Sequence, residues 1–409
     1  MRNKTFFITT VLSISLSVFS VFGMELLHQR FDRKNLPLLK NIINHLLASG
    51  CPTPKEKIGF IEFALSILDP IFAKKILKSD LKIINEKSKY GCTFLHYLVK
   101  YPAFYSESLT LDLLEKGANP NILNDEGYSA LQQAFIKNQK KYSPYIQESI
   151  DVFMNHPSNN INQQSKNKKT LLHYAIIYSD VEIIKKILKR NANTNLQDEN
   201  GNTVLHSLAE YPISICMAIA AQLLAFGAEP NVTNNNGLSP LLLILQAKYH
   251  YKYRLEAVDL KNNLFYQDFF DETLDVLINN PNTDLEIANP MNGKIALHYA
   301  AEFGDFKILS RLLKPGVNID ILDKQGMTPL NYVRKENKNK SRERDYAISI
   351  KLLSDYTQQD NIELKKPHLN NYFSRFCKVG NHKEKLKDFG FVLPGSYCNI
   401  LDFVLNKKK

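Results

Sequence analysis

The sequence predicts an all-α protein with short β-turn hairpins, arranged as an α-solenoid with helical caps. Three observations predict this fold class. A Thr-x-Leu-His motif recurs along the 409 residues, a glycine precedes most copies, and a Gly-Ala-x-Pro-Asn signature closes several units. Self-similarity at a fixed period is typical of stacked repeats, because one unit cannot bury its apolar face alone.

The motif leucines measure the repeat. They are separated by 36, 41, 33, 36, 56 and 33 residues, so the base period is 33 and four intervals contain insertions. Insertions at one kind of junction are expected to emerge on one side of a solenoid. Seven repeats are therefore predicted, on Leu95, Leu131, Leu172, Leu205, Leu241, Leu297 and Leu330.

Each repeat is predicted to contain a turn and two short helices. In the third repeat, apolar residues recur at spacings of three and four over 173–176 and 181–188, which places them on one face of each helix. Asp or Asn with a following glycine builds the turn, as in 198–201 and 323–326. Lys168 stands where the third repeat should have that glycine, so this turn either avoids positive φ or is strained.

At these residues, and at the helix-ending signatures 117–121 and 227–231, the chain resembles the ankyrin repeat family. The resemblance implies a unit of one β-turn plus two helices, and partner binding on the side formed by turn tips and inner helices. It also implies that the recurring histidines hydrogen-bond the turn and the neighbouring repeat, in preference to binding a metal. These histidines are His96, His173, His206 and His298.

The resemblance directs attention to the residue after each turn glycine. Tyr128, Leu238 and Met327 are apolar there, where solvent favours polar side chains, and Tyr90 and Met291 lie on the same tips. An exposed apolar row is typical of an interaction surface, so these five residues are predicted to contact a partner. The alternative is that such residues pack on the next tip.

An aromatic insertion over residues 249–270 enlarges the fifth repeat. Tyr251, Tyr253 and Tyr266 are predicted partner contacts, since exposed aromatics are effective interface anchors. The alternative is a longer inner helix whose rings pack back on its own repeat.

The chain ends differ from the repeats. Residues 1–23 combine Arg2 and Lys4 with an apolar run from 6 to 22, which predicts a secretory signal; the alternative is a retained membrane anchor. Residues 24–85 are predicted to form a helical N-terminal cap with a degenerate repeat, and 86–356 the seven repeats. Residues 357–409 are predicted to form a basic C-terminal helical cap or a short tail domain.

Charge and cysteine use point away from nucleic acid and metal. Residues 331–409 hold 17 Lys or Arg against 9 Asp or Glu, while 24–330 are nearly neutral. Cys377 and Cys398 are a plausible disulfide pair in an oxidising compartment. Together with His368 and His382 they match no strong zinc pattern, so no metal and no cofactor is predicted.

The functional hypothesis is an exported, monomeric, non-enzymatic protein-binding scaffold. The chain has no phosphate-cradling glycine loop and no nucleophile elbow. Frequent Asn, Lys and Ile without tryptophan suggest an AT-rich bacterial genome, which favours a host protein as the partner. Neither nucleic acid nor, after signal cleavage, a membrane is an expected partner. The alternatives are a periplasmic binding or protective module, and a ubiquitin-ligase adaptor using residues 387–405, where Leu393-Pro394 resembles the F-box-like ends of some ankyrin proteins.

Overall fold

The repeats appear as helical hairpins in the computed structural model of the chain, which describes residues 81–359 except 89, 102–106, 141, 211–215, 258–263 and 337–342. The predicted signal and the cap up to residue 80 lie outside these residues, as do the tail residues 360–409 with Cys377, Cys398, His368, His382 and the 387–405 segment. The described part contains fourteen α-helices and no strand, as the all-α prediction requires.

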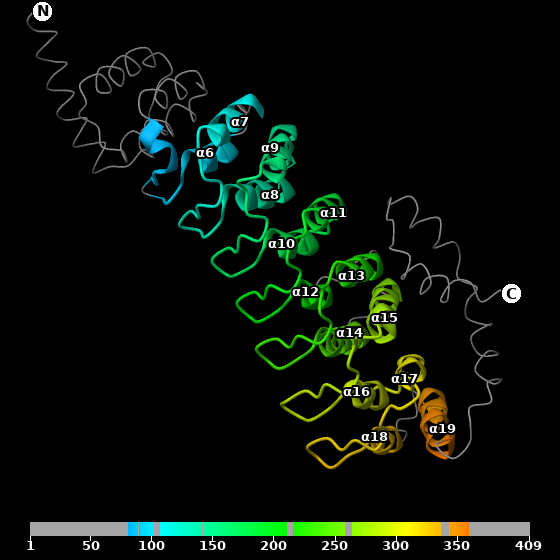
Figure 1. Ribbon diagram of the computed structural model, residues 1–409. Coiled ribbons are helices and arrows are strands. Elements are labelled where there is room, and N and C mark those ends of the chain that lie inside the picture. The colour runs from blue at the N-terminus through cyan, green and yellow to red at the C-terminus, as the bar shows by residue number, and fades with distance from the viewer. Residues whose placement is uncertain are drawn as a thin grey trace, which may run out of the picture. The chain divides into compact units, whose positions relative to one another are not determined.

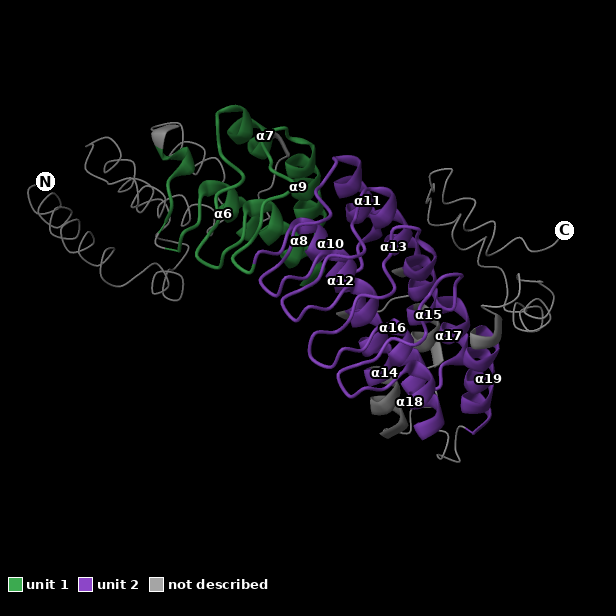
Figure 2. Cartoon of the chain, turned by 60° about the horizontal axis from the view of Figure 1, so that its bottom comes forward, with its two compact units in different colours: residues 1–167 green, residues 168–409 purple. Residues whose placement is uncertain are grey.

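The chain divides into two compact units, residues 1–167 and 168–409 (Figure 2). The described part of unit 1 contains a 3-10 helix, η2 (Leu81–Asn85), and two hairpins. These hairpins are α6 (Phe94–Lys100) with α7 (Glu107–Glu115), and α8 (Ala130–Lys140) with α9 (Pro144–Asn155).

Unit 2 contains five hairpins, each formed by an inner and an outer helix (Figure 1). Inner helices contact the inner helices of neighbouring repeats, and the last four outer helices contact their outer neighbours in the same way. The inner helices are α10 (Leu171–Ile177), α12 (Val204–Glu210), α14 (Pro240–Ala257), α16 (Ala296–Glu302) and α18 (Pro329–Glu336). The outer helices are α11 (Val181–Lys189), α13 (Cys216–Ala225), α15 (Leu264–Asn279), α17 (Phe306–Leu312) and α19 (Glu343–Gln359).

Every inner helix begins one residue before its motif leucine, so the seven leucines mark the same place in seven helices. The third repeat shows why. The Thr170 hydroxyl accepts the His173 N–H and caps α10, while the Asp180 carboxylate accepts the Ile183 N–H and caps α11. In α11 the apolar residues at three- and four-residue spacing are buried: Ile183, Ile184, Ile187 and Leu188. Each full burial contributes roughly 1.5 to 3 kcal/mol.

Neighbouring turn tips are joined by main-chain hydrogen bonds within each unit. The Asn235 N–H donates to the Asn200 carbonyl at 3.0 Å. Gly201 has φ +74°, and a Cβ there would lie 2.6 Å from the Asn235 nitrogen, so both backbone conformation and space require glycine. Lys168, in the equivalent place of the third repeat, keeps positive φ at +57°. The strained alternative is therefore the one adopted, at a cost of about 1 kcal/mol.

An asparagine clamp, which the sequence analysis did not identify, joins the ends of the outer helices. The Asn195 side chain donates to the Gly227 carbonyl at 2.9 Å and accepts the Glu229 N–H at 2.8 Å. Asn121 and Asn231 make the same pair of bonds to their next repeats. The signal was present, since these asparagines end the signatures that marked the repeats.

Replacing Asn195 with alanine is expected to lower the free energy of unfolding of unit 2 by about 1 to 2 kcal/mol, because two inter-repeat hydrogen bonds are lost at a partly solvated site. Urea denaturation followed by circular dichroism measures this. Asn236→Ala is the matched control at an exposed tip, where a change below about 0.5 kcal/mol is expected. Equal effects of the two substitutions would contradict the clamp.

Candidate functional site

The recurring histidines are buried between repeats. The Thr93 N–H donates to His96 Nδ1 at 3.1 Å, and His96 Nε2 lies 3.0 Å from the Tyr128 carbonyl. Since Nδ1 accepts a hydrogen bond, the ring proton is on Nε2 and is donated to the next repeat. His173, His206 and His298 make the same two contacts in their repeats. Burial lowers the pKa of His96, His173 and His206 to about 4, so these rings are neutral linkers.

Three repeats replace this histidine, the seventh with Asn331. In the second, Gln132 accepts the Ser129 N–H at 3.1 Å and donates to the Gln163 carbonyl at 2.8 Å, so its amide reproduces both bonds of the imidazole. In the fifth, Leu242 occupies the position and has no polar side-chain atom to bond the next tip. The fifth repeat is instead joined to the sixth through Lys248.

Lys248 lies in the extension of α14 with its side chain 5% exposed. Its ammonium contacts the Asp271 carboxylate on α15 and the Asp305 carboxylate, the latter at 2.5 Å. Asp305 also accepts the Ile308 N–H and so caps α17. Beside this cluster Tyr249 is buried and stacks on Phe303 with ring centroids 4.1 Å apart. The inserted residues therefore include a longer inner helix, as the alternative interpretation held, but the ring of Tyr249 stacks on Phe303 of the sixth repeat, whereas that interpretation placed the rings on their own repeat.

The side chains of Tyr251 and Tyr253 in α14, and of Tyr266 in α15, lie outside what the structure describes. Their assignment as partner contacts stays a prediction. Within this insertion the described aromatics Tyr249 and Phe270 are buried.

The predicted row of apolar residues after the turn glycines is not an exposed row. Leu238 is only 6% exposed, so its prediction as an exposed contact is wrong. Tyr128 and Met327 are half-buried. The physical reason is that this position faces the next repeat in unit 2: Lys169 pairs with Asp198 at 2.7 Å, and the Asn202 side chain accepts from Asn234 at 2.9 Å.

Met291 and Tyr90 are exposed on their tips, at 81% and 39%. Met291 lies on a tip that has one residue more than the tips 198–201 and 323–326. This longer tip, 289–293, is braced: Asn289 and Asn292 donate to the Tyr299 hydroxyl at 2.7 and 3.2 Å, and Lys324 donates to the Pro290 carbonyl at 2.6 Å. The hydrogen bonds hold the tip in place while the Met291 side chain stays exposed. This arrangement is typical of a preorganised anchor for a partner.

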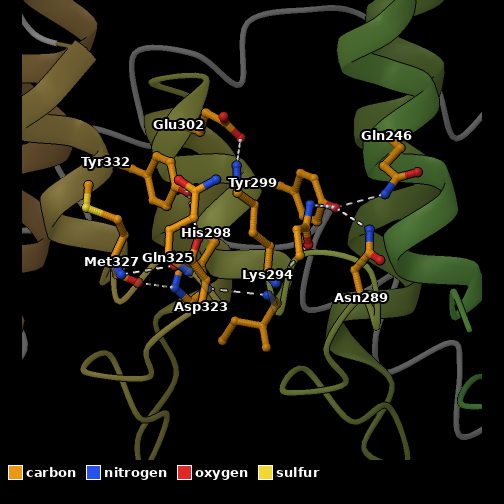
Figure 3. A network of polar contacts seen from close by, with 12 residues as sticks. Gln246, Asn289, Lys294, His298, Tyr299, Glu302, Asp323, Gln325, Met327 and Tyr332 are labelled. Atoms are coloured by element: carbon orange, nitrogen blue, oxygen red, sulfur yellow. Dashed lines mark hydrogen bonds and ion pairs between the residues drawn. The ribbon is translucent and has the colours of Figure 1, made fainter.

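Below this tip a polar network crosses the inner helices (Figure 3). The Lys294 ammonium is 2.8 Å from the Glu302 carboxylate and 4.3 Å from the centre of the Tyr332 ring. Tyr332 donates to Asp323 at 2.6 Å, and Gln246 is within 2.9 Å of the Tyr299 hydroxyl. The network joins the tip to the inner helices through buried side chains, among them Lys294, Tyr299 and Tyr332, and reaches the surface at Gln246 and Glu302.

We call this surface of unit 2 the inner face. It comprises the turn tips and the inner-helix residues five places after the motif leucine, of which the described side chains are half-buried or exposed: Ile177, Gln246, Glu302 and Lys335. Sequence reasoning considered only the position after the glycine and missed this one. The signal was a polar residue at this fixed offset from the motif leucine in five of the seven repeats.

The described residues contain no group of His, Cys, Asp and Glu that could hold a metal ion. Across the same residues, no helix combines the length and apolarity needed to cross a membrane. Cys92, at the first tip, is a buried cysteine.

Comparison with known proteins gives the repeats a family. A family model described as ankyrin repeats in three copies matches residues 95–198, 144–234 and 265–341. The chain is 25% identical over 294 residues to a putative ankyrin repeat protein of Acanthamoeba polyphaga mimivirus, covering 58% of this chain and 36% of that protein. It is 29% identical over 176 residues to Rabankyrin-5 of Mus musculus, covering 40% and 13%.

A solved crystal structure of an ankyrin repeat protein is similar with a TM-score of 0.42 and 18% identity, over 55% of this chain and 97% of that one. The chain spans about a third or less of the length of the two curated relatives. The family model covers more than half of the chain, and the turn, the two helices and the linking histidine recur in its structure. The chain belongs to the ankyrin repeat family.

Proposed function

We propose that this chain is exported through residues 1–23 and that its inner face binds a host protein. Ankyrin repeats in general form non-enzymatic scaffolds for protein–protein interaction. The observation that carries the binding proposal is Met291, because an 81% exposed methionine on a braced tip adds nothing to the packing of its own repeat. Export is supported by the basic start and the apolar run over residues 6–22.

The binding part is tested with residues 24–409 as bait in host-cell lysate, followed by affinity measurement with each purified partner. Met291→Asp is expected to weaken binding at least tenfold, which corresponds to about 1.4 kcal/mol. Met291→Leu keeps the apolar anchor and should bind nearly as the parent chain does. Asn236→Asp is a control that adds the same charge on another exposed tip. Partners that bind all four proteins equally would refute the use of this tip.

The export part is tested separately by fusing residues 1–23 to a reporter that is active only outside the cytoplasm. A signal gives reporter activity and a shortened chain, whereas a retained anchor leaves residues 1–23 attached and the reporter in the membrane fraction. Fractionation of the producing cell then separates a secreted protein from a periplasmic module. A reporter confined to the cytoplasm would reject export while leaving the binding proposal intact.

A further inference from the structure

Side chains at one position of successive inner helices form a line on the inner face of unit 2. Gln246 on α14, Glu302 on α16 and Lys335 on α18 each follow their motif leucine by five residues. Neighbouring inner helices are in contact, and packed helices lie about 8 to 10 Å apart. The last three repeats therefore each present one polar group, at an interval of about one helix diameter.

The hydrogen bonds of Tyr299 determine which atom Gln246 presents. Three amide nitrogens lie within hydrogen-bond distance of the Tyr299 oxygen, from Asn289, Asn292 and Gln246. A phenol has one hydrogen to donate and accepts about two bonds, so three donors leave its own hydrogen without an acceptor. One of the three amides must therefore be reversed.

The two asparagines are held in place by their other atoms. Asn289 Oδ1 accepts the Met291 N–H at 2.9 Å, and Asn292 Oδ1 accepts the Lys294 N–H at 3.0 Å. Reversing either would set two donors against each other. Gln246 makes no other described hydrogen bond, so its oxygen accepts from Tyr299 and its NH2 group points to the inner face.

Glu302 supplies the complementary group one helix further along. One carboxylate oxygen receives Lys294, and this side chain is 30% exposed. Its second oxygen has no partner among the described residues and remains an acceptor on the inner face. The Lys294 ammonium neutralises the charge of Glu302. Gln246 therefore offers a hydrogen-bond donor and Glu302 an acceptor, without a net charge at these two positions.

Lys335 continues the line on α18. Its side chain is exposed and forms no ion pair with a described residue. An extended chain advances about 3.3 Å per residue, so three residues span one helix interval. The spacing of these three side chains thus matches an extended main chain of a partner. Such a chain would place its amide groups at Gln246 and Glu302 and an acidic side chain at Lys335.

We propose that Gln246 and Glu302 bind main-chain amide groups of an extended segment of the protein partner, and that Lys335 pairs with an acidic residue about three positions beyond the one at Glu302. This inference rests on the proposed function, since it states what part of a partner the inner face recognises. A folded partner surface without an extended segment is the competing outcome.

The test uses linear random peptides of about twelve residues, long enough to cross four repeats at three residues each, selected on purified residues 24–409. Enriched peptides should share an acidic residue. Selection on Lys335→Glu should replace it with a basic residue, and Gln246→Met should weaken the selected peptides about tenfold at unchanged folding. Failure to enrich linear peptides, or peptides that bind Lys335→Glu equally well, overturns the proposal.

A second variant tests the orientation of Gln246. In Gln246→Glu a carboxylate can still accept from Tyr299 but has no donor for the inner face, so stability should stay close to the parent while peptide affinity falls about tenfold. If Gln246 instead donates to Tyr299, this variant should lose as much stability as Tyr299→Phe, and the inference falls. Host proteins that bind through Met291 when no linear peptide is selected would reject this inference and keep the proposed function.

Discussion

Replacing Lys248 with alanine is expected to lower the free energy of unfolding of unit 2 by about 3 to 5 kcal/mol. Asp271 and Asp305 are 16% and 11% exposed and both face the ammonium. Burial alone would lower the pKa of Lys248, but attraction to Asp305 and Asp271 outweighs it and raises the pKa, so the lysine is charged. Without the ammonium, the two carboxylates lose the cation between them and repel each other.

The loss should be local, because a repeat protein is stabilised through nearest-neighbour interfaces. Hydrogen exchange should show opening in α14, α15 and α17, and urea denaturation should give the free energy. Lys294→Ala is the matched control: its ammonium pairs with one carboxylate that is 30% exposed, so a loss near 1 kcal/mol is expected. Similar losses of unfolding free energy in both variants would show that the ion pairs of Lys248 stabilise unit 2 no more than the ion pair of Lys294 does.

A compensating variant separates charge from packing. Removing Asp271 together with Lys248 leaves Asp305 with its helix-capping bond to Ile308 and without a carboxylate opposite it. The double variant Lys248→Ala/Asp271→Ala should therefore be more stable than Lys248→Ala alone. If the second substitution only adds to the loss, repulsion between the carboxylates is not the cause.

The repeat periodicity predicted the fold, because the leucine that defines the period is buried next to the start of the inner helix in six of the seven repeats. Exposure at the tips was harder to predict. Leu238 and Met291 are both apolar tip residues, yet one is 6% and the other 81% exposed. The difference depends on their places in the tip, because the position after the turn glycine faces the next repeat, whereas Met291 lies before Gly293. Residue type alone does not report this.

The Lys248 cluster shows the second limit of sequence reasoning. In this cluster Lys248 pairs with one residue 23 positions and another 57 positions further along the chain. A single lysine in an aromatic insertion does not indicate that it has a buried partner. The periodic pattern reports which face of a helix is covered. It does not report which charged groups meet when that face is covered, because this depends on the helix lengths and insertions of two different repeats.

Acidification from about pH 7 to about pH 5 is expected to destabilise both units through their buried histidines. Burial lowers the pKa of His96, His173 and His206 from 6.5 to about 4. The unfolded chain then binds protons below about pH 6.5 that the folded chain refuses, so stability is full above 6.5 and is lost as the pH falls towards 4. At about 1.4 kcal/mol per pKa unit, each histidine contributes a loss of about 2 kcal/mol at about pH 5.

In unit 2 one group acts in the opposite direction. Burial raises the pKa of Asp275 to about 6, so the folded chain takes up this proton more readily and gains about 1 kcal/mol by about pH 5. His173 and His206 together lose about 4 kcal/mol, and the net loss in unit 2 is about 3 kcal/mol. His298, whose pKa burial also lowers, adds to the loss. Urea denaturation of the parent chain across this pH range measures the sum.

The second repeat shows which substitution can isolate the pH-dependent contribution of one histidine. Gln132 already makes both inter-repeat bonds without a titrating group, so His206→Gln should keep most of the stability at about pH 7 and remove about 2 kcal/mol of the acid loss. His206→Leu copies Leu242 of the fifth repeat and leaves the Thr203 N–H and the Leu238 carbonyl without their partner, so it should lose stability at every pH. If His206→Gln retains the full pH dependence, protonation of the imidazole is not what destabilises the repeat, and the titrating group must be sought among the buried carboxylates.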